Sequence, residues 1–190
     1  MDKDKIKRAI YDILVAIGEN PEREGLKDTP KRVSDMYEEI FSGIKEDPNS
    51  HLRIFKEEYL NNEFVLLRDI PVHSMCEHHM LPFVGVANVV YMPKDGNIIG
   101  LSKLSRIVNC YARRLQVQER LTSQISGFLF ENMEVHGVGV MVKAEHMCMT
   151  MRGVKSLGTK TVTLSFNGSL KDDENLKQKA TMLLLGEDSK

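Results

Sequence analysis

Two long segments rich in β-branched and aromatic residues follow each other in the middle of the chain, and they constrain its fold more than any other feature. They are EFVLLRDIPV at 63–72 and VGVANVVYMP at 84–93, separated only by the stretch 73–83. Residues of these types favour strands. Strands that come in neighbouring pairs favour hairpin pairing and an α+β layer over a parallel βαβ sheet. The sequence therefore predicts an antiparallel hairpin here.

Helical patterns surround this pair of strands. Apolar residues spaced by three and four predict helices over 6–17, ended by Gly18, and over 30–41, begun by Thr29 and Pro30. Segment 45–53 reads as a loop. Similar spacing predicts helices over 104–111 and 117–129, and GVGVMVKAEHMC at 137–148 and TKTVTLSFNG at 159–168 predict two more strands.

The order of helices, two strands, two helices and two strands predicts an α+β fold with an antiparallel sheet and two helices layered on it. The polar C-terminal tail is compatible with a helix. We expect a single structural unit, made of an N-terminal helical region over 1–60 and a catalytic domain over 61–190.

Bulk composition excludes several classes of protein. Hydrophobic residues make up 42% of the chain, charged residues 28%, and the formal net charge is -1, so nothing indicates binding to nucleic acid or to a membrane surface. No run approaches the roughly 20 apolar residues that cross a bilayer, and the N-terminus lacks the apolar core of a signal peptide. The odd number of cysteines, 3, predicts reduced thiols in the cytoplasm.

The stretch CEHHMLPF at 76–83 places a thiol, a carboxylate and two imidazoles side by side. Cys76 and His79 have the spacing of two ligands on one turn around a metal ion, a weak signal when it stands alone. EHMC adds His146 and Cys148, two apart on a predicted strand, where alternate residues face the same side. Thiolates and imidazoles together suit zinc.

Cys76, His79 and Cys148 give three ligands, and three protein ligands with one open position are typical of catalytic zinc. The remaining thiol, Cys110, reads as a helix-packing residue; as a fourth ligand it would make the site structural. His78 and His146 adjoin the ligands and suit proton transfer near neutral pH. The alternative for both is a supporting or structural role.

A second cluster carries cations and a possible base-recognition pair. Lys103 and Arg106 share a helix face, Arg152 follows Cys148 by four residues, and Arg32 lies just inside the second helix. Cations near an open metal indicate a polyanionic substrate such as a phosphate chain, whereas the alternative is an ordinary solvated face.

Gln118 and Glu119 stand together at the start of a helix, where the helix dipole alone favours a carboxylate. A carboxylate with a carboxamide also matches the donor and carbonyl edges of guanine.

Five motifs in order resemble the GTP cyclohydrolase I family: DTPKRV, CEHH, GLSKLSRIV, QVQERLT, and EHMC followed by MRG. The resemblance runs from about Asp28 to Gly168. It implies the T-fold, with zinc held by Cys76, His79 and Cys148 and an activated water that attacks C8 of the guanine ring. It further implies the following roles: proton transfer by His78 and His146; ribose contact by Ser102; guanine recognition by Gln118, Glu119 and the backbone at Leu101; and triphosphate binding by Lys103, Arg106, Arg152 and Arg32.

The resemblance also implies a product and an assembly. GTP is converted to 7,8-dihydroneopterin triphosphate with release of formate, in homodecamers whose active sites lie between subunits. Two alternatives stay open: a non-catalytic structural-zinc module that regulates a partner, and a sister T-fold enzyme of pterin or deazapurine chemistry. A zinc deaminase is disfavoured because its H-x-E and P-C-x-x-C pattern is missing.

Overall fold

The computed structural model describes residues 1–57 and 63–186. In chain order, its elements are α1 (Lys3–Ala16), α2 (Thr29–Ile40), the 3₁₀ helices η1 (Ser42–Ile44) and η2 (Pro48–His51), β1 (Ile54–Lys56), β2 (Val65–Cys76), β3 (Pro82–Pro93), β4 (Asn97–Ile99), α3 (Leu101–Ala112), β5 (Leu115–Gln116), α4 (Gln118–Asn132), β6 (Val135–His146), α5 (Met147–Thr150), β7 (Thr161–Gly168), α6 (Ser169–Asp172) and α7 (Glu174–Leu185).

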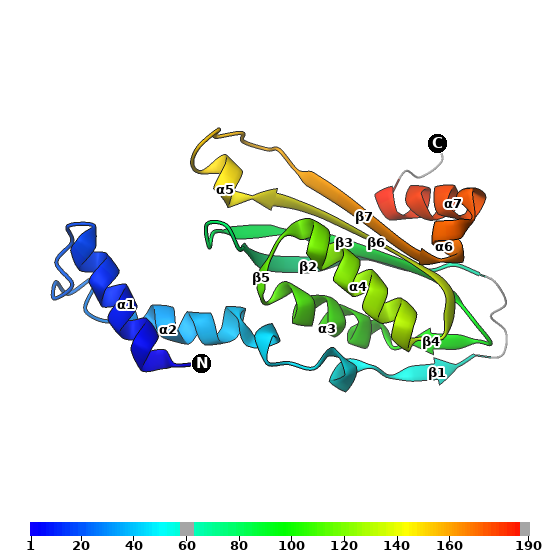
Figure 1. Ribbon diagram of the computed structural model, residues 1–190, viewed down its shortest axis with the longest axis horizontal. Coiled ribbons are helices and arrows are strands. Elements are labelled where there is room, and N and C mark those ends of the chain that lie inside the picture. Colours follow the sequence, from blue (N-terminus) through cyan, green and yellow to red (C-terminus); the bar gives the residue numbers. More distant parts are fainter. Residues whose placement is uncertain (58–62, 187–190) are drawn as a thin grey trace.

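A five-stranded sheet in the order β5-β2-β3-β6-β7 forms the centre of the molecule (Figure 1). The pairs β2–β3, β3–β6 and β6–β7 are antiparallel, and only the short β5 runs parallel to its neighbour β2. The predicted hairpin over 63–93 is therefore confirmed, and the stretch between its strands is the turn that carries the CEHH motif.

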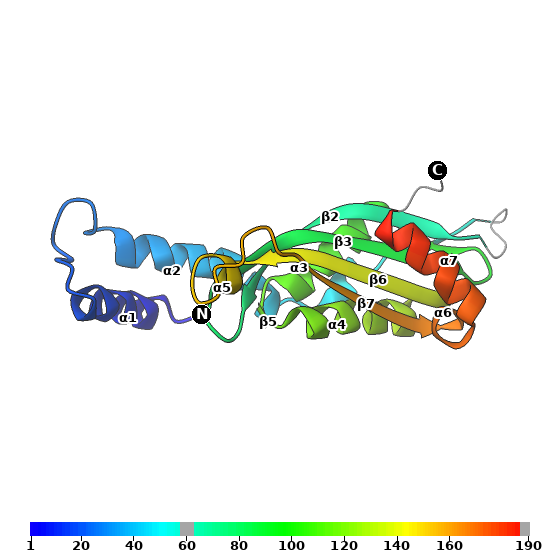
Figure 2. The same ribbon diagram turned by 90° about the horizontal axis from the view of Figure 1, so that it is seen from above.

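Helices cover one face of the sheet and part of the other, and the two-residue period of the strands decides which side chains lie on which face. Helices α3 and α4 lie along one face, while α6 and α7 cover one end of the other (Figures 1 and 2). Along β3, Val89 belongs to the cluster under α3 and α4, and its neighbour Val90 belongs to the cluster under α7. Leu104 of α3 and Leu121 of α4 are fully buried in the larger cluster.

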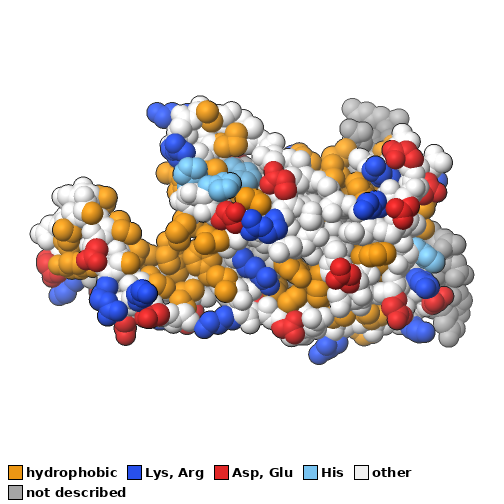
Figure 3. Space-filling model, in the orientation of Figure 1, with side chains coloured by type: hydrophobic (Ala, Val, Ile, Leu, Met, Phe, Trp, Pro, Cys, Tyr) orange, Lys and Arg blue, Asp and Glu red, His pale blue; other side chains and the backbone are white. Residues whose placement is uncertain are grey.

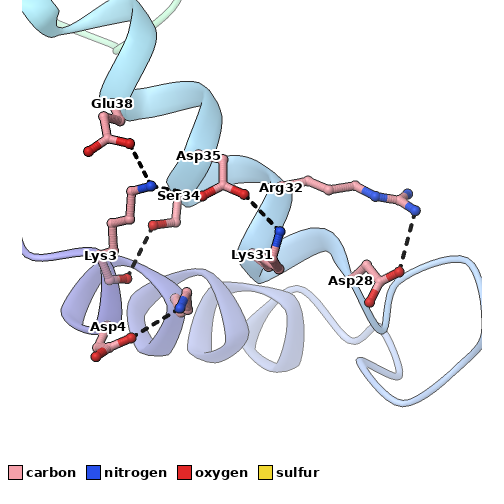
Figure 4. Close-up of polar contacts among 9 residues, drawn as sticks. Lys3, Asp4, Asp28, Lys31, Arg32, Ser34, Asp35 and Glu38 are labelled. Carbon is pink, nitrogen blue, oxygen red and sulfur yellow. Dashed lines mark hydrogen bonds and ion pairs between the residues drawn. The ribbon is translucent and has the colours of Figure 1, made fainter.

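The N-terminal helices extend beyond the end of the sheet (Figures 1 and 2). Helices α1 and α2 pack against each other, and Lys3 joins them through ion pairs with Asp35, at 3.0 Å, and with Glu38 (Figure 4). The hydroxyl of the buried Ser34 donates to the backbone carbonyl of Lys3 at 3.2 Å. The two N-terminal helices thus stabilise each other outside the main hydrophobic core.

The predicted α+β class, with an antiparallel sheet, two layered helices and an N-terminal helical region, is confirmed. Two local predictions are wrong. The strand expected over 137–148 ends at His146, so that Cys148 lies on α5, and the loop expected over 45–53 contains η2. The boundary expected between residues 60 and 61 lies outside the described residues.

Within the described residues, no helix is long and apolar enough to cross a membrane.

Two glycines provide a matched test of the packing of the sheet. A Cβ at Gly85 of β3 would lie 1.9 Å from the backbone carbonyl oxygen of Lys143 on β6, whereas a Cβ at Gly127 of α4 would meet nothing within 4 Å. We expect Gly85→Ala to lower the free energy of unfolding by about 2 kcal/mol or more, because the strands must separate. Gly127→Ala should raise it by about 0.5–1 kcal/mol, because alanine loses less entropy in a helix. Denaturant unfolding of both variants measures this, and equal shifts would contradict the register of β3 and β6.

Candidate metal centre

The β2–β3 turn and the start of α5 meet at one end of the sheet and bring three ligand side chains together. The ligand atoms of Cys76, His79 and Cys148 all lie within 4.8 Å of one another. Cys76 is the last residue of β2 and is buried, Cys148 is half-buried, and His79 lies exposed in the turn. Figure 3 shows His side chains gathered on the surface at this end, beside acidic and basic ones.

Backbone contacts fix the turn on which two of these ligands stand. Cys76 donates its N–H to Leu81 and accepts from Met80, at 2.8 and 2.9 Å. Met80 adopts a positive φ of 52°, which a methionine takes only where its surroundings impose it. Glu77 forms a two-pronged ion pair with Arg120 of α4, at 2.7 and 2.9 Å, which ties the turn to that helix.

The donor set and its spacing fit a zinc ion. The two sulfurs, Cys76 Sγ and Cys148 Sγ, lie 4.0 Å apart, close to the separation of about 3.8 Å that Zn–S bonds of 2.3 Å give in a tetrahedral site. Burial and the neighbouring Cys76 raise the pKa of the Cys148 thiol. Two thiolates this close need a cation to balance their charge, and a metal ion supplies one.

One contact of His79 must change when it binds a metal through Nε2. Arg152 Nη1 lies 3.0 Å from that nitrogen. A guanidinium only donates hydrogen bonds, so Nε2 acts here as the acceptor and its lone pair is in use. Ligation by this atom would therefore displace Arg152 from the ring and leave its charge free for an anion.

His146 lies beside the three ligands, at the end of β6. Its ring stacks on Phe83, with ring centroids 4.6 Å apart and planes at 11°, and its Nε2 is 2.8 Å from Gln118 Oε1. Burial lowers the pKa of His146, and the nearby carboxylate of Glu119 opposes this shift. His78 is exposed in the turn, with Nδ1 at 3.8 Å from the sulfur of Cys76.

Other residues expected in the site lie far from the metal ligands in the fold. Helix α3 runs from β4 to β5, and β5 pairs with Met75 and Cys76. The 12 residues of α3 span about 18 Å, so Leu101, Ser102 and Lys103 at its start lie at the opposite end from the metal ligands (Figure 1).

The two remaining arginines are also separated from the metal ligands. Arg106, in the middle of α3, lines a surface hollow with Glu46, His51 and Asn109. Arg32 pairs with Asp28 at 3.4 Å on the N-terminal helical region (Figure 4). Within one chain, the metal ligands thus lie near His78, His146, Gln118, Glu119 and Arg152. The expected residues of α3 and α2 lie away from them.

The sequence predicted Cys148 in this group because it predicted a strand there. In the structure, Cys148 reaches the group from α5, a turn of helix directly after β6. The sequence indicated no role for Arg120, whose pairing with Glu77 could have been suspected only from the charges. It placed Cys110 correctly in a helix: the thiol is buried in α3, 3.6 Å from the backbone carbonyl of Glu46 and outside the ligand group.

The fold and these ligands together define an α+β protein with a thiolate and imidazole metal group at one end of its sheet. Comparison with known proteins identifies the family. The family model described as GTP cyclohydrolase I matches residues 6–185, and the chain therefore belongs to the GTP cyclohydrolase I family. The T-fold architecture expected from the resemblance agrees with this assignment.

Three similar proteins align with this chain over nearly their whole length. The chain is 54% identical to GTP cyclohydrolase 1 of Carboxydothermus hydrogenoformans, over 100% of this chain and 97% of that protein. It is 55% identical to GTP cyclohydrolase 1 of Bacillus pumilus over 91% of each. It is 50% identical to GTP cyclohydrolase 1 of Acetivibrio thermocellus, over 98% of this chain and 99% of that one.

A solved crystal structure of the archaeosine synthase QueF-Like in the apo form is 18% identical, with a TM-score of 0.47, over 57% of this chain and 96% of that chain. This likeness is too weak to carry an argument.

Thiol alkylation tests whether the three side chains act as one metal group. We expect the half-buried Cys148 thiol of the metal-free protein to react with iodoacetamide. Added Zn²⁺ should suppress this reaction, because a metal-bound thiolate no longer attacks. Cys110 is the internal control, since its burial keeps it slow in both states. Mg²⁺, which prefers oxygen ligands, should protect nothing. Mass spectrometry of each cysteine gives the rates, and equal rates for Cys148 with and without Zn²⁺ would exclude the group as a zinc site.

Proposed function

We propose that the protein is a zinc-dependent GTP cyclohydrolase I, which hydrolyses the imidazole ring of GTP at C8, releases formate and forms 7,8-dihydroneopterin triphosphate. The observation that carries this proposal is the convergence of Cys76, His79 and Cys148 in a chain of this family. Membership supports the substrate and the reaction, and the ligand group supports the metal. A purely structural zinc site would gain nothing from the imidazoles beside it.

Cys76, His79 and Cys148 would hold the zinc ion. When bound, zinc supplies Lewis-acid chemistry that makes water a nucleophile near neutral pH. Three protein ligands leave a position for solvent, and among the described residues Cys110 is directed toward Glu46 and not toward this group.

Two imidazoles and one carboxylate beside the group would serve the substrate. We assign His78, exposed in the turn, to donate a proton to the opening ring, and His146 to handle protons around the ribose. Glu119 is exposed at the start of α4 and close enough to affect the pKa of His146. Its carboxylate would accept the ring N–H and exocyclic amine of guanine. The backbone at Leu101, which lies at the far end of α3 and would come from a second copy of the chain, would complete recognition of the base.

The separation of the remaining residues supports an active site shared between subunits. Ser102 and Lys103 begin a helix whose other end lies near Cys76, and Arg32 lies on the N-terminal helical region. We propose that a second copy brings Ser102 to the ribose, and Lys103, Arg106 and Arg32 to the triphosphate beside Arg152. A closed homo-oligomer, with the decamer as the expected form, would repeat such a shared site at each contact.

The three free thiols fit a reducing compartment, and we place the protein in the cytoplasm.

Incubation of the zinc-loaded protein with GTP tests the proposed reaction, with formate and, after oxidation, a fluorescent pterin as readouts. We expect both products in equal amounts. His78→Ala should retain zinc and lower kcat by about 10²-fold or more, because it loses a positioned proton donor. His136→Ala, an exposed imidazole at the other end of β6, is the matched control and should keep the wild-type kcat. Absence of formate from the wild-type protein would refute the proposed reaction, and a normal kcat in His78→Ala would remove that residue from it.

Mixed oligomers test the shared site. Cys148→Ser and Lys103→Ala are each expected to lower kcat/KM strongly when assembled alone. If one site takes Cys148 from one copy and Lys103 from another, co-assembly at equal amounts restores intact sites in about a quarter of positions. The measurement is kcat/KM of co-expressed, doubly tagged oligomers, compared with a mixture of the two pre-assembled variants. A site contained within one chain gives no recovery in either sample.

A further inference from the structure

Gln118, the first residue of α4, carries an amide that is 1% exposed and entirely engaged with protein groups. Its Nε2 lies 2.9 Å from the carbonyl oxygen of Val142, 3.0 Å from that of Thr161, and 3.1 Å from Thr163 Oγ1. Its Oε1 lies 2.8 Å from His146 Nε2. The side chain therefore connects strands β6 and β7 to the imidazole beside the metal ligands.

These contacts leave the amide only one orientation. Carbonyl oxygens only accept hydrogen bonds, so the nitrogen of the amide must face Val142 and Thr161, and the oxygen must face His146. The reverse orientation would set an acceptor against two acceptors in a buried site, at the cost of unsatisfied polar groups.

Two threonine hydroxyls close the network around this amide. Thr122 Oγ1 donates to the backbone carbonyl of Gln118 at 2.8 Å, which uses its only proton. The contact of 2.6 Å between Thr122 Oγ1 and Thr163 Oγ1 must then carry the proton of Thr163. Thr163 is left as an acceptor toward Gln118, in agreement with the orientation of the amide. The two hydroxyl hydrogens and the orientation of the amide are thus fixed, and the two amide hydrogens face three acceptors.

The network determines which nitrogen of His146 carries the proton in the neutral ring. Gln118 Oε1 only accepts, so His146 Nε2 must donate, and the lone pair of the neutral imidazole lies on Nδ1. No hydrogen bond to that Nδ1 is made within the part of the chain that the structure describes. Stacking on Phe83 holds the plane of the ring, so both its direction and its tautomer are set.

We propose that Gln118 is a positioning residue, which holds His146 in the Nε2–H tautomer and so presents Nδ1 as the basic nitrogen available to substrate. Both amide hydrogens are used by β6 and β7, so this side chain does not read guanine, and recognition of the base is left to Glu119 and the backbone at Leu101. The effect on turnover rests on the proposed function, whereas the tautomer of His146 does not.

Nitrogen NMR of the histidine rings tests the tautomer directly. The probe is the zinc-loaded full chain labelled with ¹⁵N-histidine, sedimented for solid-state measurement, with the His146 signal assigned from its loss in His146→Gln. We expect only the Nε2–H tautomer in the wild type and a mixture of both tautomers in Gln118→Met. The matched control is Gln116→Met. That amide is 2% exposed and donates to the carbonyl oxygen of Tyr111 and to Gln124, so its loss should leave His146 unchanged.

A second pair of variants keeps Gln118 in place and guards against misfolding of Gln118→Met. Thr163→Val removes one of the three acceptors but leaves the carbonyls of Val142 and Thr161, which can take both amide hydrogens, so we expect the Nε2–H tautomer of His146 to persist. Thr163→Ser keeps the hydroxyl and should retain the wild-type spectrum. An Nδ1–H tautomer in the wild-type protein or in Thr163→Val, or an unchanged His146 signal in Gln118→Met, would overturn the proposal.

Kinetics separate positioning from recognition of the base. Gln118→Met should lower kcat for GTP by about 10-fold to 10²-fold, a part of what a positioned acid or base contributes, with little change in KM. Glu119→Ala should instead raise KM for GTP. A raised KM with unchanged kcat in Gln118→Met would assign the amide to the base and refute the positioning role. If the wild-type protein does not turn over GTP, the proposed function fails, while the NMR result still decides the tautomer.

Discussion

The pairing of backbone groups around Cys76 is the constraint on which the candidate site depends. Cys76 is held on one side by β3, through the register that places Met75 opposite Pro82, and on the other by β5, through its own pairing with Gln116. The next residue, Glu77, donates its N–H to the Gln116 carbonyl at 3.0 Å. A thiolate fixed on both sides by a sheet loses little further freedom on binding a metal, so the turn and α5 have only to bring the remaining ligands.

The same sheet determines what lies beside the ligands. The register of β3 and β6 sets Phe83 opposite His146, which brings the imidazole into stacking distance and starts α5 one residue later. The pairing of β6 with β7 then places Val142 opposite Thr163, so that acceptors from two strands converge on the amide of Gln118. Buried polar groups of this kind stabilise a site only when every member has a partner, and the threonine pair completes the set.

Much of the fold and the identity of the ligands could be predicted from the sequence, because both depend on local patterns. The hairpin follows from two β-branched segments, and Cys76 and His79 follow from their spacing. The two-residue strand β5 and the β1–β4 pair could not be foreseen, since neither segment has a pattern of its own and each forms only by contact with a distant strand. The hydrogen bonds of the Gln118 amide could not be foreseen for the same reason, because its partners lie 24 to 45 residues away.

The position of α3 explains why a chain with all the expected residues does not assemble them alone. Apolar residues on one side of the helix pack it against the sheet, with Leu104, Ile107 and Val108 all buried. Its polar start is thereby held about 18 Å from β5 and Cys76. Bringing Ser102 and Lys103 to the metal ligands within one chain would mean withdrawing those apolar side chains from the core, each worth about 1.5–3 kcal/mol. In the proposed shared site, a second copy would supply the same groups without disturbing the core, so the packing that stabilises the subunit is compatible with that proposal.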